Sequence, residues 1–260
     1  MNIDYNHKAN RHTQAGPRVA LPLLLGSSRP QSLLDVGCGT GTWLKAALEL
    51  GTPAVFGIDG IELPDQQFLA SKSSFKKVDL SAAWDLGRRF DLAMCLEVAE
   101  HLPAHAAELL VKSLTSHADK IIFAAACPGQ EGQGHINCQW PAYWQAWFNE
   151  YGFRCEDSLR WRIWEEGKVE PWYRQNLFMA TKDPDQAGIE PRIHRVLHPS
   201  MFAGDAMPDM SRIRPEVIGQ IEQGSEPLGW YLSIPFRGVL AKIRRTRKAS
   251  ETNRSIQASH

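Results

Sequence analysis

The sequence has no long apolar stretch and no excess of charge of either sign. A membrane-spanning helix needs roughly 18 to 20 consecutive apolar residues, and no segment of this chain is that long. Lys and Arg together number 29, as do Asp and Glu, so no overall field favours nucleic acid. The N-terminus lacks the apolar run of a secretion signal. We therefore expect a cytoplasmic protein without a membrane span.

Cysteine is also scarce. The five cysteines include no C-x-x-C pair, and their number is odd, which indicates reduced thiols rather than a disulfide framework. No internal repeat is present. With 260 residues and 43% apolar content, the chain is long enough for one α/β domain of about 150 to 200 residues with extensions.

Strand-like and helix-like segments alternate from Ser32 onward, which predicts a parallel sheet with crossover helices. His105 and His117 are expected at solvated helix positions. Residues 154–164 and 173–181 are expected to pair as an antiparallel hairpin at the sheet edge. The other strands after the first are expected at 55–59, 75–79, 90–96 and 120–126, and helices at 43–50, 103–117 and 141–151.

Three parts are predicted along the chain. Residues 1–30 are expected to form a helical extension, residues 31–182 the α/β domain, and residues 183–260 an irregular extension with a basic tail. Because the sheet pattern is complete by Thr181, we expect a chain truncated after Asp183 to fold.

A glycine-rich turn joins the first strand to the helix at 43–50. Residues 33–41 read Leu-Leu-Asp-Val-Gly-Cys-Gly-Thr-Gly, so three glycines stand at alternate positions. Glycine lets the backbone approach a ligand closely and adopt angles that a side chain forbids. A dinucleotide-binding loop, G-x-G-x-x-G, has its third glycine one residue later. Asp35 stands two residues before Gly37, where a carboxylate suits an ammonium and a sulfonium better than a phosphate.

This segment resembles motif I of the class I S-adenosylmethionine (SAM) methyltransferases. The resemblance implies a Rossmann-like α/β fold, with a seven-stranded, mostly parallel sheet, an antiparallel edge hairpin and helices on both faces. It also implies SAM as the cofactor, with its methionine end against Asp35, Gly37, Gly39 and Gly41.

Two further acids follow strands of the predicted sheet, at the carboxyl ends where such sheets bind ligands. Asp59 closes the second strand, where its carboxylate can accept both ribose hydroxyl protons. Asp79, with Leu80 beside it, matches the family position that meets the adenine, and Asp85 is a weaker candidate for that role. The alternative is that these acids only cap turns.

The fourth strand runs into Glu-Val-Ala-Glu-His at residues 97–101. One helical turn would put Glu97, Glu100 and His101 on one face, and His135 follows the neighbouring fifth strand. Two carboxylates and two imidazoles form a donor set suited to Mg²⁺, Mn²⁺ or Zn²⁺. Without a metal, His135 or His101 is a candidate general base, and the glutamate hydrogen-bonds to the backbone.

The E-x-x-E-H turn with its later histidine resembles the metal site of the small-RNA 2′-O-methyltransferases. The turn alone resembles that of the ubiquinone-pathway O-methyltransferases. In both families the metal engages oxygens of the acceptor, where a cation stabilises the oxyanion of a hydroxyl. Residues 134–144 and 172–177 resemble a group of bacterial methyltransferase-domain proteins, a likeness that covers about residues 1–182 and leaves the substrate open.

Three functions are compatible with these features. O-methylation of a small-molecule or glycan hydroxyl is expected first. RNA 2′-O-methylation is the alternative, against which stand the neutral charge and the lack of a basic stripe in the domain. A SAM-binding, membrane-associated scaffold is the third, because the tail carries apolar and then basic residues that suit peripheral membrane contact. The tail residues are Trp230, Ile234, Phe236, Leu240, Lys242, Arg244, Arg245, Arg247 and Lys248.

Overall fold

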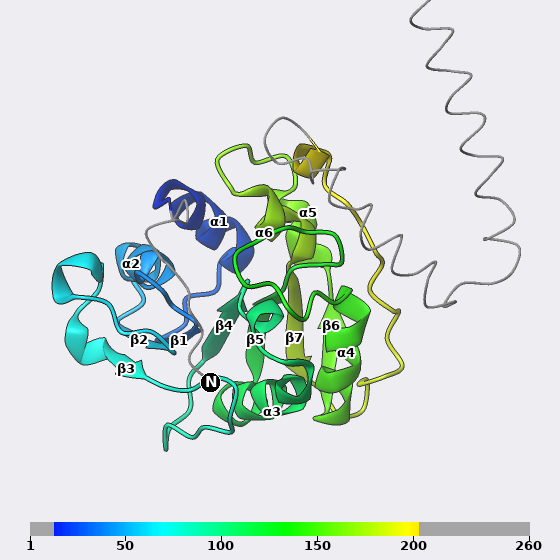
Figure 1. Cartoon of the computed structure of the whole chain (residues 1–260), viewed down its shortest axis with the longest axis horizontal. Coiled ribbons are helices and arrows are strands. Elements are labelled where there is room, and N and C mark those ends of the chain that lie inside the picture. Colours follow the sequence, from blue (N-terminus) through cyan, green and yellow to red (C-terminus); the bar gives the residue numbers. More distant parts are fainter. Residues whose placement is uncertain (1–12, 203–260) are drawn as a thin grey trace, which may run out of the picture. The chain divides into compact units, whose positions relative to one another are not determined.

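The structure is a computed structural model that describes residues 13–202. The strands are β1 (Ser32–Val36), β2 (Ala54–Asp59), β3 (Phe75–Lys77), β4 (Leu92–Leu96), β5 (Lys120–Ala124), β6 (Phe153–Glu156) and β7 (Phe178–Lys182). They form one seven-stranded sheet in the order β3-β2-β1-β4-β5-β7-β6 (Figure 1). Neighbouring strands are parallel, except that β7 is antiparallel to both β5 and β6. The predicted Rossmann-like sheet with an antiparallel edge pair is confirmed.

Helices cover both faces of the sheet. They are α1 (Ala15–Leu25), α2 (Thr42–Glu49), α3 (Ala107–His117), α4 (Pro141–Glu150), α5 (Ser158–Ile163) and α6 (Pro171–Asn176). Leu33 and Leu34 of β1 are both fully buried but belong to separate apolar clusters. Leu33 packs with residues of α1, α2 and α5, whereas Leu34 packs with residues of α3 and α4. This burial on two sides explains why β4 and β5 read as apolar runs and why two leucines stand side by side in β1.

The end of the domain differs from the predicted hairpin. β6 and β7 are antiparallel neighbours, but α5 and α6 lie between them in the chain. α5 replaces most of the strand expected over 154–164, and α6 replaces the start of the strand expected over 173–181. α6 begins at Pro171, and proline suits a first helical turn because its missing N–H has no partner there. Arg160 of α5 is buried and donates to the main-chain oxygen of Gln175 in α6. This tertiary contact ties the two helices together and overrides the local strand propensity.

Helix α3 begins later than predicted, because residues 104–106 form a 3₁₀ turn before it. The prediction of a solvated His117 at its end is wrong, since this side chain is buried. His117 Nδ1 donates to the Ser113 carbonyl at 2.6 Å, and Nε2 accepts the Leu86 N–H at 2.9 Å. The imidazole therefore fastens α3 to the segment that precedes β4.

Residues 183–202 pack against the α/β domain. The Glu190 carboxylate accepts hydrogen bonds from Gln145 (2.9 Å), from Asn149 (2.7 Å) and from the Cys155 N–H (3.0 Å). Desolvation would raise the pKa of Glu190, but these hydrogen bonds outweigh it and hold the pKa at about 2. The contacts favour a domain that continues beyond residue 182.

The predicted basic tail, including Trp230 and the residues listed with it, lies outside the described residues. Within residues 13–202, no helix is long and apolar enough to cross a membrane.

Candidate functional site

The glycine turn after β1 is packed too closely for side chains. Gly37 and Gly41 both have a φ of 75° and Gly39 has 49°, in the left-handed region that glycine adopts at no steric cost. A β-carbon on Gly37 would lie 2.3 Å from a methyl carbon of Val98, and one on Gly41 would lie 3.0 Å from the Phe68 ring. Backbone strain and lack of space therefore both require glycine here.

Asp59 links the end of β2 to this turn. Its Oδ2 accepts the Gly39 N–H at 2.9 Å, and its Oδ1 accepts the Ile61 N–H at 2.8 Å. A carboxylate oxygen can accept more than one hydrogen bond, so both oxygens retain capacity for ribose hydroxyls. The ribose role stays a prediction, and the structure adds that Asp59 holds the glycine turn in place.

Asp35 of β1 is 2% exposed, and its Oδ2 has no hydrogen-bond partner among the described residues. Burial, and secondly the charge of Asp59, raise the pKa of Asp35 to about 7. A buried carboxylate oxygen without a donor is costly, and a positively charged ligand would relieve that cost. The orphaned oxygen and the close-packed glycines together fit a cofactor that carries an ammonium and a sulfonium, as SAM does.

Asp79 and Asp85, the two candidates for the adenine position, both stabilise turns. Asp79 is exposed and accepts hydrogen bonds from the Ser81 N–H and hydroxyl, which lower its pKa. Asp85 accepts the Gly87 N–H at 2.7 Å. Leu80 is buried. The adenine assignment of Asp79 and Leu80 stays a prediction.

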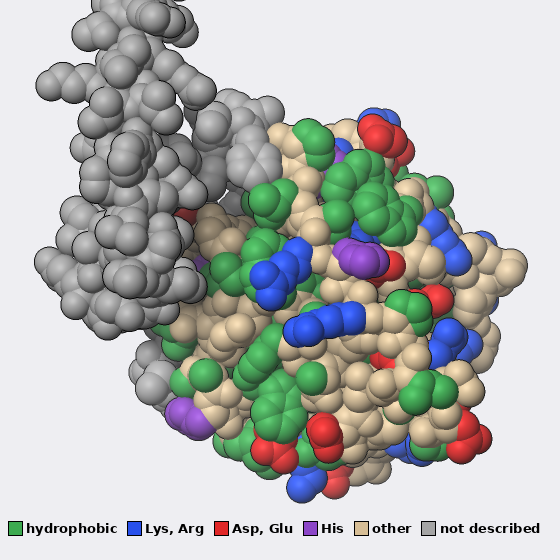
Figure 2. Space-filling view, turned by 90° about the vertical axis from the view of Figure 1, so that its right-hand side faces the viewer, with side chains coloured by type: hydrophobic (Ala, Val, Ile, Leu, Met, Phe, Trp, Pro, Cys, Tyr) green, Lys and Arg blue, Asp and Glu red, His purple; other side chains and the backbone are tan. Residues whose placement is uncertain are grey.

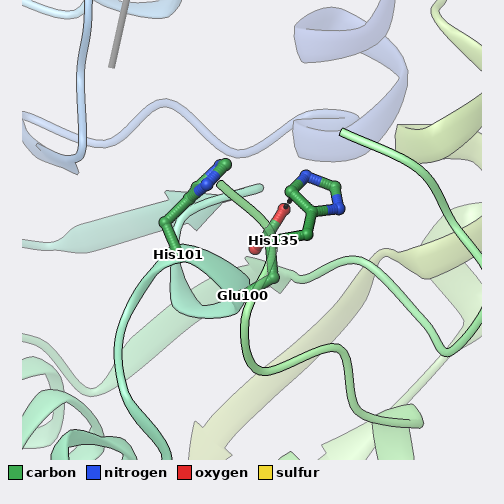
Figure 3. A group of neighbouring side chains, drawn as sticks. All are labelled: Glu100, His101 and His135. Atoms are coloured by element: carbon green, nitrogen blue, oxygen red, sulfur yellow. Dashed lines mark ion pairs between the residues drawn. The ribbon is translucent and has the colours of Figure 1, made fainter. Parts of the chain in front are cut away.

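Glu100, His101 and His135 come together beyond the carboxyl ends of β4 and β5. Glu100 and His101 lie on the 3₁₀ turn Ala99–His101 that follows β4, and His135 lies on the loop after β5. One donor atom from each side chain lies within 4.8 Å of the other two. His135 Nε2 is 3.9 Å from Glu100 Oε1, and the two imidazole centroids are 4.9 Å apart. The Glu100 carboxylate lies between the two rings in Figure 3.

Glu100 is fully buried. Neither of its carboxylate oxygens makes a well-formed hydrogen bond to a described residue, although the main-chain N–H groups of Glu100 and Ala126 lie nearby. Burial, and secondly the charge of Glu97, raise the pKa of Glu100 well above its usual range. A buried carboxylate of this kind binds a proton or a cation, so Glu100 is suited to be a cation ligand.

His135 is held over Glu100 by its own loop. The N–H groups of residues 136–137 both donate to the Glu100 carbonyl, at 2.9 and 3.0 Å. The Gln130 carbonyl accepts the His135 Nδ1–H at 3.0 Å, so Nε2 carries the lone pair. A β-carbon on Gly132 would lie 2.1 Å from Nε2, and glycine therefore makes room for the ring. Burial lowers the pKa of His135, which favours the neutral form that coordinates metals.

Glu97, the fourth predicted donor, does not belong to this group of three, although its carboxyl group interacts with that of Glu100. Its φ is 56°, the one positive value among the non-glycine residues that the structure describes, and such a conformation costs about 1 to 3 kcal/mol. Its Oε1 accepts Asn176 Nδ2 at 3.1 Å and its Oε2 accepts Gln130 Nε2 at 2.7 Å. Burial raises the pKa of Glu97 to about 7. Glu97 precedes the turn that carries the other two residues instead of sharing one helical face with them.

Sequence reasoning missed Gln130 and Asn176, which hold Glu97, and Phe68, which packs on Gly41. Neither amide stands at a spacing that links it to Glu97, since 33 and 79 residues separate them along the chain. One signal was available for Asn176, which lies within the segment 172–177 noted above for its resemblance to bacterial proteins.

Residues 5–120 match a family model described as a methyltransferase domain. No sequence among the curated proteins matches this chain. Among solved structures, the chain is similar to the sugar N-methyltransferase KedS8 from Streptoalloteichus sp., with a TM-score of 0.50 and 16% identity over 68% of this chain and 91% of that one. It is also similar to the magnesium protoporphyrin IX methyltransferase from Synechocystis with bound SAM, with a TM-score of 0.48 and 20% identity over 65% and 79% of the two chains. At 16% identity the likeness to KedS8 is one of fold alone.

Proposed function

We propose that this chain is a class I SAM-dependent methyltransferase that methylates a hydroxyl oxygen of a small molecule or a glycan with the help of a divalent cation. The methyltransferase-domain match over residues 5–120 and the order of the seven-stranded sheet support the first part of this proposal. The observation that carries the proposal is the convergence of Glu100, His101 and His135. These residues follow β4 and β5, at the same edge of the sheet as the glycine turn after β1.

The glycine turn and the acids around it form the SAM site in this proposal. Asp35 meets the methionine ammonium, since its buried Oδ2 has no other partner among residues 13–202. Asp59 accepts the ribose hydroxyls while it holds Gly39, and Asp79 with Leu80 borders the adenine. Methyl transfer is an in-line displacement in which the sulfonium charge disappears. The main tasks of the protein are therefore to align the acceptor and to remove its proton.

Glu100, His101 and His135 would hold the cation. One carboxylate and two imidazoles are a common donor set for a catalytic ion, and three protein ligands leave coordination positions open. A bound divalent cation would lower the pKa of an acceptor hydroxyl and stabilise its oxyanion. The Gln130 carbonyl keeps His135 Nε2 available for coordination, and Glu97 takes no direct part.

General-base catalysis by the same histidines is the alternative mechanism. His135 Nε2, or an imidazole nitrogen of His101, would accept the hydroxyl proton without a cation, as positioned imidazoles do in many enzymes. The two mechanisms differ in their response to chelation, because only the first loses activity when the cation is removed.

The charge distribution favours a small acceptor over RNA. Lys plus Arg equals Asp plus Glu over the whole chain. On the face drawn in Figure 2, basic and acidic side chains are interspersed, whereas proteins that track an RNA backbone carry a basic stripe. All five cysteines lie within residues 13–202 and none forms a disulfide there, which supports a reducing, cytoplasmic compartment. The scaffold alternative depends on tail residues outside the described part of the chain.

The test measures transfer of a tritiated methyl group from SAM to three acceptor sets: small polyols and phenols, sugar nucleotides, and RNA. We expect incorporation into one of the first two sets, a loss of at least about 10-fold in EDTA, and recovery with Mn²⁺. Glu100→Gln should behave like the chelated enzyme, while Glu131→Gln, an exposed change in the loop of His135, should keep its activity. Transfer to RNA would overturn the acceptor class, and transfer that EDTA leaves unchanged would overturn the role of the cation.

A further inference from the structure

A line of side-chain amides connects His198 to Glu97. The His198 main-chain N–H donates to Gln175 Oε1 at 2.8 Å, and Gln175 Nε2 donates to Asn176 Oδ1 at 3.1 Å. Asn176 Nδ2 then donates to Gln130 Oε1 at 2.8 Å and to Glu97 Oε1 at 3.1 Å. Finally, Gln130 Nε2 donates to Glu97 Oε2 at 2.7 Å.

Both ends of this line fix its direction. A main-chain N–H can only donate and a carboxylate accepts, so each amide between His198 and Glu97 has one orientation that satisfies its neighbours. Turning any one amide over would place two donors or two acceptors face to face. Gln175 and Asn176 are 1% and 2% exposed, and a buried polar group that loses its partner is destabilising. The line therefore holds its members in a single arrangement.

Gln130 joins this line to the cation ligands. Its side chain binds Asn176 and Glu97, while its main-chain oxygen accepts the Nδ1–H of His135 at 3.0 Å. That bond leaves Nε2, which lies 3.9 Å from Glu100 Oε1, as the nitrogen with the lone pair. Partners on the second ring nitrogen of a ligating histidine typically change metal affinity by about 10- to 100-fold.

We propose that Asn176 is a positioning residue for the site formed by Glu100, His101 and His135. Asn176 fixes Gln130 and, through Gln130, the ring orientation and tautomer of His135. The expected effect on cation binding rests on the proposed function, whereas the hydrogen bonds from Asn176 to His135 are present in the chain without a cation. Gln175 and His198 hold Asn176 in turn. Residues 183–202 thereby support the site without contributing a ligand.

The first test compares full-length wild-type chain with Asn176→Ala by ¹⁵N NMR of the histidine rings near pH 8. This measurement distinguishes the Nδ1–H from the Nε2–H tautomer, and His135→Gln assigns the signal among the nine histidines. We expect the Nδ1–H tautomer in the wild type and a mixture of the two in Asn176→Ala, since a loosened Gln130 carbonyl no longer selects one form. A general loss of stability would not change the tautomer of a folded ring.

The second readout is the dissociation constant for Mn²⁺ alone, measured by electron paramagnetic resonance of the free ion. Asn176→Ala should weaken binding by about 10- to 100-fold. The matched control is Asn149→Ala, which also removes a hydrogen-bonded amide. Asn149 donates to the Phe153 carbonyl and to Glu190, away from Gln130, so this control should leave both readouts unchanged.

An unchanged His135 tautomer together with an unchanged Mn²⁺ affinity in folded Asn176→Ala would overturn the proposal. If the wild type binds no Mn²⁺, the cation part of the proposed function fails, and the tautomer readout still decides the role of Asn176. If Asn176→Ala does not fold, the second variant is Gln130→Ala. It removes the side-chain hydrogen bonds of Gln130 to Asn176 and Glu97 by a change in the loop itself. That variant must then show the tautomer mixture, and a pure Nδ1–H signal would contradict the proposal.

Discussion

His135 Nε2 lies 3.9 Å from Oε1 of Glu100, a buried carboxylate without a well-formed hydrogen bond to any described residue. The two residues follow neighbouring parallel strands, β5 and β4. Two N–H groups of residues 136–137 donate to the Glu100 carbonyl, so the backbone itself brings the histidine loop onto the acidic turn. The main chain therefore brings the two segments together, and the Gln130 carbonyl orients the His135 ring toward Glu100.

Gly132→Ala should disturb this approach. A β-carbon at this position would lie 2.1 Å from His135 Nε2, so the ring has to leave its present position. We expect Mn²⁺ affinity and methyl transfer to fall by about 10- to 100-fold, the range seen when a ligand loses its orientation. Gly167→Ala is the matched control, because nothing lies within 4 Å of a β-carbon there. Equal affinities for the two variants would contradict the placement of His135.

Asp59→Ala should weaken SAM binding by about 2 to 4 kcal/mol, since the variant loses charge-assisted hydrogen bonds to the ribose. It also releases the N–H groups of Gly39 and Ile61, so the melting temperature without ligand should fall as well. Calorimetry with SAM and thermal unfolding measure the two effects. Asp65→Ala replaces an exposed carboxylate in the connection between β2 and β3, and this control should change neither the SAM affinity nor the melting temperature. An unchanged dissociation constant for Asp59→Ala would remove Asp59 from the cofactor site.

Asp35→Asn should change how stability depends on pH. The pKa of Asp35 is raised from 3.8 to about 7 in the folded chain, so the folded state binds more protons than the unfolded state between these values. The contribution of this group to stability is complete below about pH 4 and is lost as the pH rises to about 7. Asparagine does not titrate, and the stability of the variant relative to wild type should rise by about 2 to 3 kcal/mol from pH 5 to pH 8.

Urea unfolding at the two pH values measures this difference. The same variant should bind SAM less tightly at pH 8, because the amide brings no negative charge to the ammonium. A relative stability that does not change with pH would mean that Asp35 is ionised in the folded protein from pH 5 upward.

Glu190→Ala should lower the free energy of unfolding at pH 7 by about 1 to 3 kcal/mol, because Gln145, Asn149 and the Cys155 N–H lose a charged acceptor. The folded-state pKa of Glu190 is depressed to about 2. Its contribution is thus present above the usual glutamate pKa of 4.5 and fades as the pH falls toward 2, so the stability difference between the wild type and the variant should shrink steadily over that pH range. Asp185→Ala, an exposed neighbour, is the control. If Glu190→Ala and Asp185→Ala have equal stabilities, the domain boundary predicted at residue 182 stands.

The sheet follows from the sequence because its central strands are buried on both faces. β4 and β5 each read as an apolar run, β1 has two adjacent leucines before Asp35, and the glycine turn marks where β1 ends. Between β6 and β7 the apolar residues Leu159 and Ile163 belong to helix α5, but spacing alone suits a strand equally well. The buried contact of Arg160 with Gln175 favours the helix over the strand, and the local sequence pattern does not predict that contact.

The residues of the site that follow strand ends could be predicted from the sequence. The side-chain amides that reach the site from distant parts of the chain could not. Glu100 and His101 follow β4 and His135 follows β5, so the parallel sheet brings them to one edge. The left-handed backbone of Glu97 has no signal in its local sequence. It depends on Asn176 and Gln130, which come from separate parts of the chain and meet only in the fold.

The most direct test of the account is anomalous diffraction from a crystal of the full chain grown with S-adenosylhomocysteine and MnCl₂. We predict one manganese peak within about 2.0 to 2.6 Å of a Glu100 oxygen and of ring nitrogens of His101 and His135, beside the sulfur of the cofactor product at the glycine turn. A structure with the product bound at the glycine turn but without manganese among these three side chains would contradict the account.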